Sequence, residues 1–221
     1  KKLKKKEMNF FQSDIIILSK LIKNNNFDKA YDYMSSISEN NYPTLQELLN
    51  QIIFSWIKIE KSNLNFSEAN EVFQQISPRY KNIKKINDVF LNCYFDTKNA
   101  EAQFKNLVND QNTDFSRYTF FYIDYLLKKG LPQKATLVLE AKLLDVPRNI
   151  LLNQLYSDIK KERQNYLQNS FNCKNISHII AELFYITANA LSSQSLYSFS
   201  NFYVNLAKYL NNIITTKQIS G

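Results

Sequence analysis

The stretch Pro132-x-x-Ala135-x3-Leu139 places a small alanine three residues after a turn residue and four before a bulky apolar one. The arrangement recurs upstream, with Thr97 in the turn position of the last copy: Phe27-x-x-Ala30-x3-Met34, Phe66-x-x-Ala69-x3-Phe73 and Ala100-x3-Phe104. Successive alanines are 39, 31 and 35 residues apart, which is close to the length of a stacked helical hairpin. Closely crossing helices need a small side chain at the crossing. The pattern therefore predicts an array of antiparallel helical hairpins.

The composition also favours helices joined by short turns. The 221 residues are 44% hydrophobic and include only two glycines and four prolines, too few for a β-rich or loop-rich fold. The longest early apolar run, Ile15 to Leu18, is far shorter than the roughly 20 residues of a membrane span. We expect an all-α protein in which the hairpins stack into a right-handed α-solenoid, soluble for the chain as given.

Apolar residues at helical spacing divide the chain into successive parts. We expect a basic segment at 1–12, four hairpins over 13–147, an irregular helix and linker over 148–175, a final hairpin over 176–212 and a tail over 213–221. Gly130 occupies the position of a left-handed helix C-cap. The alanine register is lost through the polar linker and returns with Ser200 in the place of the alanine.

The two cysteines, Cys93 and Cys173, are far apart in sequence, and neither belongs to a C-x-x-C pair. Cys93 falls in an apolar helical stretch, where a free cysteine behaves as a small core residue. We therefore expect no disulfide framework, and the cysteines do not indicate a redox compartment.

No motif of a catalytic site is present in the sequence. His178 is the only histidine, which excludes a histidine pair for a metal, and no nucleophile motif lies beside it; a structural role is the more common one for such a residue. Two glycines cannot build a phosphate-binding loop. We expect no enzyme, no cofactor and no metal site.

The final hairpin has a more specific pattern. It reads Ala181-Glu182-x-x-Tyr185-x-x-Ala188-x-Ala190-Leu191, followed by Tyr203-x-x-Leu206-Ala207-x-Tyr209-Leu210. With Ala207 at the small position of the second helix, the hairpin resembles a tetratricopeptide repeat (TPR), and most of the chain is similar to an uncharacterised alphaproteobacterial TPR family. Asn212 and Thr97 depart from the residues that the repeat prefers at their positions.

The resemblance implies a protein-protein interaction scaffold that binds a peptide or helix of a partner in a concave groove lined by the first helix of each hairpin. When the hairpins are aligned with the repeat, the positions expected to face the groove are Arg117, Phe120, Asp124, Glu182, Tyr185 and Asn189. Family members are usually longer, which implies either a fragment of a longer array or an end covered by a partner. Self-association through an uncapped C-terminal face is a further option.

The alternative hypothesis is RNA binding by lysines and tyrosines on a helical-repeat surface. The net charge of +8 invites it, and basic and aromatic residues alternate at Arg79-Tyr80-Lys81 and Arg117-Tyr118. Only four of the 28 basic residues are arginine, however, and no polar pair recurs at equivalent repeat positions. A solvated lysine surface is the more common explanation of such a charge.

The compartment is not determined by the sequence. The lysine-rich start at residues 1–6 is similar to the basic region of a signal peptide, but the apolar run that follows is too short for one. The cytoplasm is favoured for the chain as given, and the periplasm if an upstream signal has been removed.

Overall fold

A computed structural model of the chain describes residues 11–37, 44–161 and 171–211. Over these residues it contains helices and turns and no strand, which confirms the predicted all-α class. Most of the predicted segment 1–12 and the whole tail 213–221 lie outside the described residues, as do residues 162–170 of the predicted linker.

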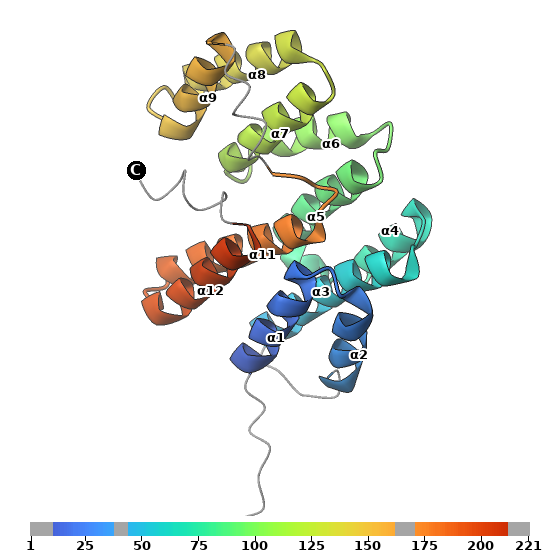
Figure 1. Cartoon of the computed structure of the whole chain (residues 1–221). Coiled ribbons are helices and arrows are strands. Elements are labelled where there is room, and N and C mark those ends of the chain that lie inside the picture. Colours follow the sequence, from blue (N-terminus) through green and yellow to red (C-terminus); the bar gives the residue numbers. More distant parts are fainter. Residues whose placement is uncertain (1–10, 38–43, 162–170, 212–221) are drawn as a thin grey trace, which may run out of the picture.

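The helices follow one another in hairpins (Figure 1). Their bounds are α1 Phe11–Lys23, α2 Phe27–Ile37, α3 Thr44–Ser62, α4 Phe66–Gln74, a 3-10 turn η1 Pro78–Tyr80, α5 Lys81–Tyr94, α6 Ala100–Val108, α7 Ser116–Lys128, α8 Pro132–Asp145, α9 Ile150–Lys160, α11 Ile176–Ser193 and α12 Tyr197–Leu210. The pairs α1–α2 to α7–α8 cover residues 11–145, and the pair α11–α12 covers residues 176–210. The ranges expected for hairpins were 13–147 and 176–212.

One type of turn joins the two helices in all five of these hairpins. Each turn contains one residue with positive φ: Asn25, Asn63, Asp96, Gly130 and Ser195. The amide of the next residue donates to the carbonyl five residues earlier, as from Asn26 to Leu21 and from Leu196 to Leu191. This is the Schellman ending of a helix, which glycine, asparagine and aspartate accommodate most readily. The final hairpin therefore repeats the geometry of the first four.

A small buried residue follows every such turn at nearly the same distance. Ala30, Ala69, Ala100 and Ala135 are all 0% exposed, and Ser200 occupies the corresponding position in α12 at 7% exposure. Each lies at the start of the second helix, where a larger side chain would meet the first helix. The alanine register of the sequence thus marks the crossing points of the hairpins.

The first helices of successive hairpins pack on one another. Trp56 of α3 is buried and donates its indole N–H to Asn87 of α5 at 2.9 Å. The ring of Phe90 in α5 lies 6.1 Å from that of Tyr118 and 6.0 Å from that of Phe121, both in α7. Contacts between aromatic rings at such distances add to the burial of their area. Helices α3, α5 and α7 form one continuous layer.

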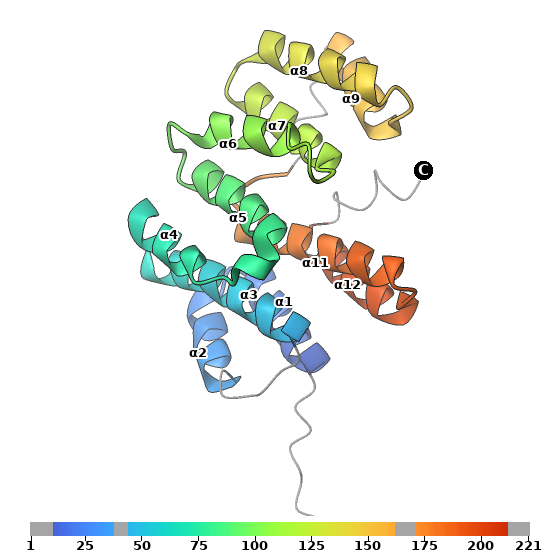
Figure 2. The same cartoon turned by 180° about the vertical axis from the view of Figure 1, so that it is seen from behind.

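The final hairpin folds back along this layer instead of stacking beyond α9. Helix α11 contacts α1, α3 and α12, and α12 contacts α1. Lys23 at the end of α1 donates to the carbonyl of Leu210 at the end of α12, with an Nζ–O distance of 2.9 Å. Helices α8 and α9 lie at the opposite end of the molecule from α1 and α2 (Figures 1 and 2).

The expectation that the chain has no disulfide is wrong. Cys93 and Cys173 are 80 residues apart in sequence, yet their Cα atoms are 5.9 Å apart and their sulfurs are bonded. The reason is the fold-back, because the segment before α11 has to pass the end of α5 on its way to α1. Closing a loop of this length stabilises a fold by about 4–5 kcal/mol in the chain-entropy model.

Within the described ranges, no helix is both long enough and apolar enough to cross a membrane.

The role of the crossing residues is testable within one helix. Ala100 of α6 is fully buried, whereas Ala102, two residues on, is exposed. Ala100→Leu would force a branched side chain into the hairpin crossing, and we expect it to lower the free energy of unfolding by about 1–3 kcal/mol. Ala102→Leu is the matched control and should change it by less than about 0.5 kcal/mol. Equal effects in urea unfolding would refute the assignment of Ala100 to the crossing.

Candidate functional site

Two of the residues that the sequence assigned to a partner groove bind each other. Arg117 of α7 donates from Nε and Nη2 to the two carboxylate oxygens of Glu182 in α11, at 2.6 and 2.5 Å. The side chain of Glu182 is 0% exposed and that of Arg117 is 17% exposed. A two-pronged contact of this kind is the strongest geometry for an arginine–carboxylate pair. It fixes α11 to α7 across 65 residues of sequence.

Tyrosines complete this cluster. The hydroxyl of Tyr118 donates to Glu182 at 3.2 Å, and the guanidinium carbon of Arg117 lies 3.8 Å from the centre of the Tyr185 ring. Burial raises the pKa of Tyr118 well above its ordinary value, and the carboxylate of Glu182 raises it further. Burial by itself would lower the pKa of Arg117, but the charge and hydrogen bonds of Glu182 outweigh it and the pKa is raised. The arginine therefore keeps its charge inside the protein.

The other three predicted groove residues lie apart from this cluster. Asp124 is buried and accepts from Lys128, one turn on, at 2.8 Å. Lys128 also donates to the carbonyl of Phe171 in the segment before α11. Phe120 is half-buried against Phe121, and Asn189 is exposed on α11. The structure thus brings together Arg117, Glu182 and Tyr185, and leaves Phe120, Asp124 and Asn189 outside their cluster.

The face that the first helices would offer to a partner is consequently covered by α11 of the same chain. Arg117, Glu182 and Tyr185 bind α7 to α11, so their polar groups are committed within the molecule. Arg117 and Tyr118, one of the two basic and aromatic pairs behind the RNA-binding hypothesis, lie in the same cluster. That the six residues bind a partner stays a prediction.

The sequence reasoning missed an open groove on the other side of α7. It has a volume of about 360 Å³ and lies between α6, α7 and α8. Tyr122 and Thr119 line it from α7, and Val138 and Leu137 line it from α8. Thr119 is 1% exposed, and its hydroxyl has no hydrogen-bond partner among the described residues. The groove combines apolar walls with an unused polar atom, which is typical of binding sites.

An exposed apolar row runs along α8 beside this groove. Leu137 is 66% exposed and Leu144 is 85% exposed, with the exposed Ala141 between them. Spacings of four and three residues place all three on one face of the helix. The sequence does contain the signal, because α8 has leucines on both of its faces, one for the hairpin and one for the solvent.

Lysines surround the groove. Lys134 pairs with Glu101, and Lys142 lies 3.7 Å from Asp145. Lys105 also lines the groove and has no carboxylate within ion-pair distance in the part of the chain that the structure describes. Three lysines against two carboxylates leave this surface positive, so it favours an acidic ligand.

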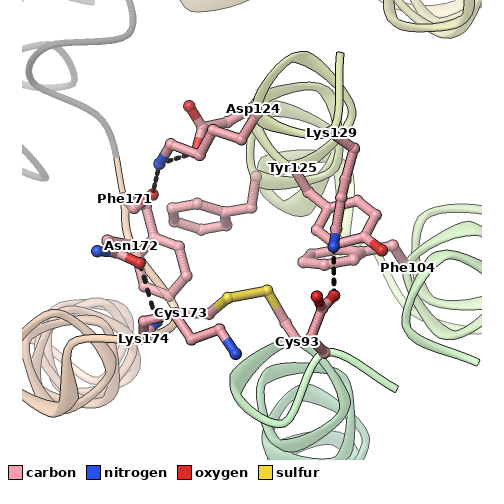
Figure 3. Close-up of a pocket in the computed structure, with 12 residues that line it drawn as sticks. Cys93, Phe104, Asp124, Tyr125, Lys129, Phe171, Asn172, Cys173 and Lys174 are labelled. Atoms are coloured by element: carbon pink, nitrogen blue, oxygen red, sulfur yellow. Dashed lines mark hydrogen bonds and ion pairs between the residues drawn. A yellow bond between two sulfur atoms is a disulfide. The ribbon is translucent and has the colours of Figure 1, made fainter. Parts of the chain in front are cut away.

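A second cavity, of about 210 Å³, lies beside the disulfide (Figure 3). Cys93 comes from α5, Tyr125 and Lys128 from α7, and residues 171–174 from the segment before α11. Figure 3 shows the sulfur–sulfur bond at the edge of this space, with the rings of Phe104 and Phe171 beside it. Phe121 also lines the cavity. Lys129, paired with Asp96, and Lys174 also line the cavity.

His178 holds the segment before α11 in place. Its Nδ1 accepts from the backbone amide of Asn172 at 3.1 Å, which requires that nitrogen to be unprotonated. Burial lowers the pKa of His178 to about 4, and the positive charges of Lys23 and Lys128 contribute. The side chain is therefore a neutral, structural group at neutral pH.

In the described part of the chain, no group of three or more histidine, cysteine, aspartate or glutamate side chains could hold a metal ion. Comparisons with models of protein families, with curated proteins and with solved structures gave no match. The function therefore has to be inferred from the surfaces described above.

A double-mutant cycle tests the cluster at Arg117. Arg117→Met leaves Glu182 buried without its partner, and we expect it to lower the free energy of unfolding by about 3–5 kcal/mol. Glu182→Met should be destabilising as well, but the double variant should lose much less than the sum of the two, because neither charge is then left alone. Urea unfolding provides the four free energies. Additive losses would show that the two side chains do not interact.

The pKa of His178 can be measured directly, because the chain has one histidine. A proton NMR titration of its imidazole should have a midpoint near pH 4 in the folded protein and near 6.5 in urea. The pKa is lowered by folding, so the histidine stabilises the fold above about pH 6.5, and this contribution is lost as the pH falls toward 4. A midpoint near 6.5 in the folded protein would contradict the partial burial of this side chain.

Proposed function

We propose that this chain is a TPR-like protein-interaction scaffold that binds an amphipathic partner helix in the groove between α6, α7 and α8. Repetition supports the architecture, since five hairpins share one turn and one buried small residue. Helical-hairpin arrays of this kind, including right-handed solenoids, commonly act by presenting a surface. The chain's lack of a catalytic motif agrees with such a role.

The exposed leucine row on α8 is the observation that carries the proposal. Leaving Leu137 and Leu144 in water forgoes roughly 1.5–3 kcal/mol for each side chain that could be buried. Contiguous exposed apolar residues beside a groove mark interaction sites more often than isolated ones do. The layer of first helices already holds α11, so the α6–α8 side offers the accessible groove.

The partner's chemistry follows from the lining. A helix presenting apolar side chains at intervals of three and four residues matches the row from Leu137 to Leu144. An acidic residue on its edge would meet Lys105, which forms no ion pair with another described residue. A polar atom reaching the base of the groove would satisfy the hydroxyl of Thr119. An acidic amphipathic helix is therefore the class of partner we propose.

Selection from a displayed library of amphipathic helical peptides tests this proposal. We expect acidic peptides to be enriched, and the double variant Leu137→Glu, Leu144→Glu to reduce their affinity by at least about tenfold, since each lost apolar contact is worth about 1–2 kcal/mol. Tyr197→Glu is the matched control, because Tyr197 is 61% exposed on α12, away from the groove. It should bind the selected peptides as the unchanged protein does.

Two results would count against the proposal. One is the failure of any peptide to bind, and the other is an equal loss of affinity in the Tyr197→Glu variant. Titration with single-stranded RNA at two salt concentrations covers the alternative function. Binding that falls steeply with salt would favour RNA binding over the scaffold.

A further inference from the structure

We propose that the Cys93–Cys173 disulfide is a thiol-exchange site whose cavity admits a small anionic thiol, which opens the bond by attack on Cys173. This inference is independent of the groove between α6 and α8. It rests on three features: the exposure of one sulfur-bearing residue, the charge of the cavity, and the packing that keeps the surrounding segment in place.

The two cysteines differ in accessibility. Cys93 lies in the last turn of α5 and is 5% exposed, whereas Cys173 lies in the segment before α11 and is half-buried. Both line the cavity of about 210 Å³. Thiol–disulfide exchange depends on which sulfur can be reached, so the geometry points to Cys173 as the sulfur that is attacked and to Cys93 as the leaving group.

The cavity carries a positive excess. Lys128 and Lys129 are paired with Asp124 and Asp96, respectively. The ammonium of Lys174 donates to the backbone carbonyl of Tyr94, and its charge has no carboxylate within ion-pair distance among the described residues. A positive field concentrates an anionic thiol and favours its thiolate form. It also stabilises the thiolate that leaves on Cys93.

The size and walls of the cavity fit a small ligand. A volume of about 210 Å³ admits a molecule of several heavy atoms, and the rings of Phe104, Phe121 and Tyr125 provide apolar contact for its carbon chain. A negatively charged group on the ligand would face the lysines. A small thiol that carries a carboxylate satisfies both requirements.

The exchange is balanced with two equivalents of the thiol. In the first step the thiolate forms a bond to the sulfur of Cys173, the Cys93–Cys173 bond breaks, and Cys93 leaves as a thiolate that takes up the proton released by the attacking thiol. A second thiolate then attacks the ligand sulfur of the mixed disulfide, and Cys173 leaves. The protein disulfide is reduced by two electrons, and two thiols are oxidised to one disulfide.

Opening the bond does not by itself release the segment. The ring of Phe171 lies 4.8 Å from that of Phe90 and 4.6 Å from that of Phe121, and Lys128 holds the carbonyl of Phe171. These contacts keep Cys173 at the cavity after reduction. The mixed disulfide therefore forms on a folded protein, and the bond can close again.

The test compares two thiols and two variants of the full, oxidised chain. 3-Mercaptopropionate carries a carboxylate, and 2-mercaptoethanol is its uncharged counterpart. The rate of opening, expressed per thiolate, is followed by the appearance of protein thiols. Peptide mass spectrometry of acid-quenched samples identifies the modified cysteine.

We expect the anionic thiol to react faster than the neutral one by about threefold, the effect of one unscreened charge a few ångströms away. Lys174→Gln should remove this preference. Added salt should reduce the ratio of the two rates in the unchanged protein, because it screens the charge of Lys174. Lys29→Gln is the control: it removes the same charge from an exposed position on α2, and it should leave the preference unchanged. Early samples should carry the mixed disulfide on Cys173.

Three outcomes would overturn the proposal. The first is opening at the rate of global unfolding, which would mean that the folded protein does not admit a thiol. The second is an equal preference in Lys174→Gln and the unchanged protein, with both shown to be folded by circular dichroism. The third is a mixed disulfide confined to Cys93.

Discussion

Helix α11 has to be buried on two sides, and the rest of the structure depends on this constraint. Eleven of its 18 residues are buried, far more than a helix with one apolar stripe requires. Helix α12 covers one side. The layer formed by the first helices of the other hairpins covers the second, and so the chain returns past α5 to α1 instead of continuing beyond α9. The final hairpin folds back because this packing buries the second apolar side of α11.

The position of α11 explains the unusual groups that accompany it. A carboxylate in the middle of an apolar helix is costly to bury unless it is paired, and Glu182 meets Arg117 of α7 at the depth where both are shielded from water. The segment before α11 crosses the end of α5, where Cys173 meets Cys93. At the end of the final hairpin, Lys23 of α1 donates a hydrogen bond to the carbonyl of Leu210 in α12. Helix α11 covers the layer formed by the first helices. The open groove therefore lies on the other side, between α6, α7 and α8.

The sequence predicts the local structure well and the long-range structure poorly, for physical reasons. Helix periodicity and the buried alanines define the hairpins, and Gly130 adopts the predicted left-handed conformation with φ of 71°. These signals lie within about 40 residues of one another. The contact of Cys93 with Cys173 joins residues 80 apart, and no periodic pattern encodes it. The phase of the repeat predicted Arg117 and Glu182 as residues of a groove for a partner. It contains no information on which helices meet, and so it could not show that the two side chains bind each other.

The fold-back is most directly tested by a distance between α1 and α12. Nitroxide labels at Lys20 and Tyr209, both exposed, can be measured by pulsed electron spin resonance in the oxidised protein. If α12 packs on α1, the distance distribution has one narrow maximum at the short end of the accessible range. If the final hairpin instead extends the array beyond α9, at least three hairpins separate the labels, and the distance is longer by about 30 Å.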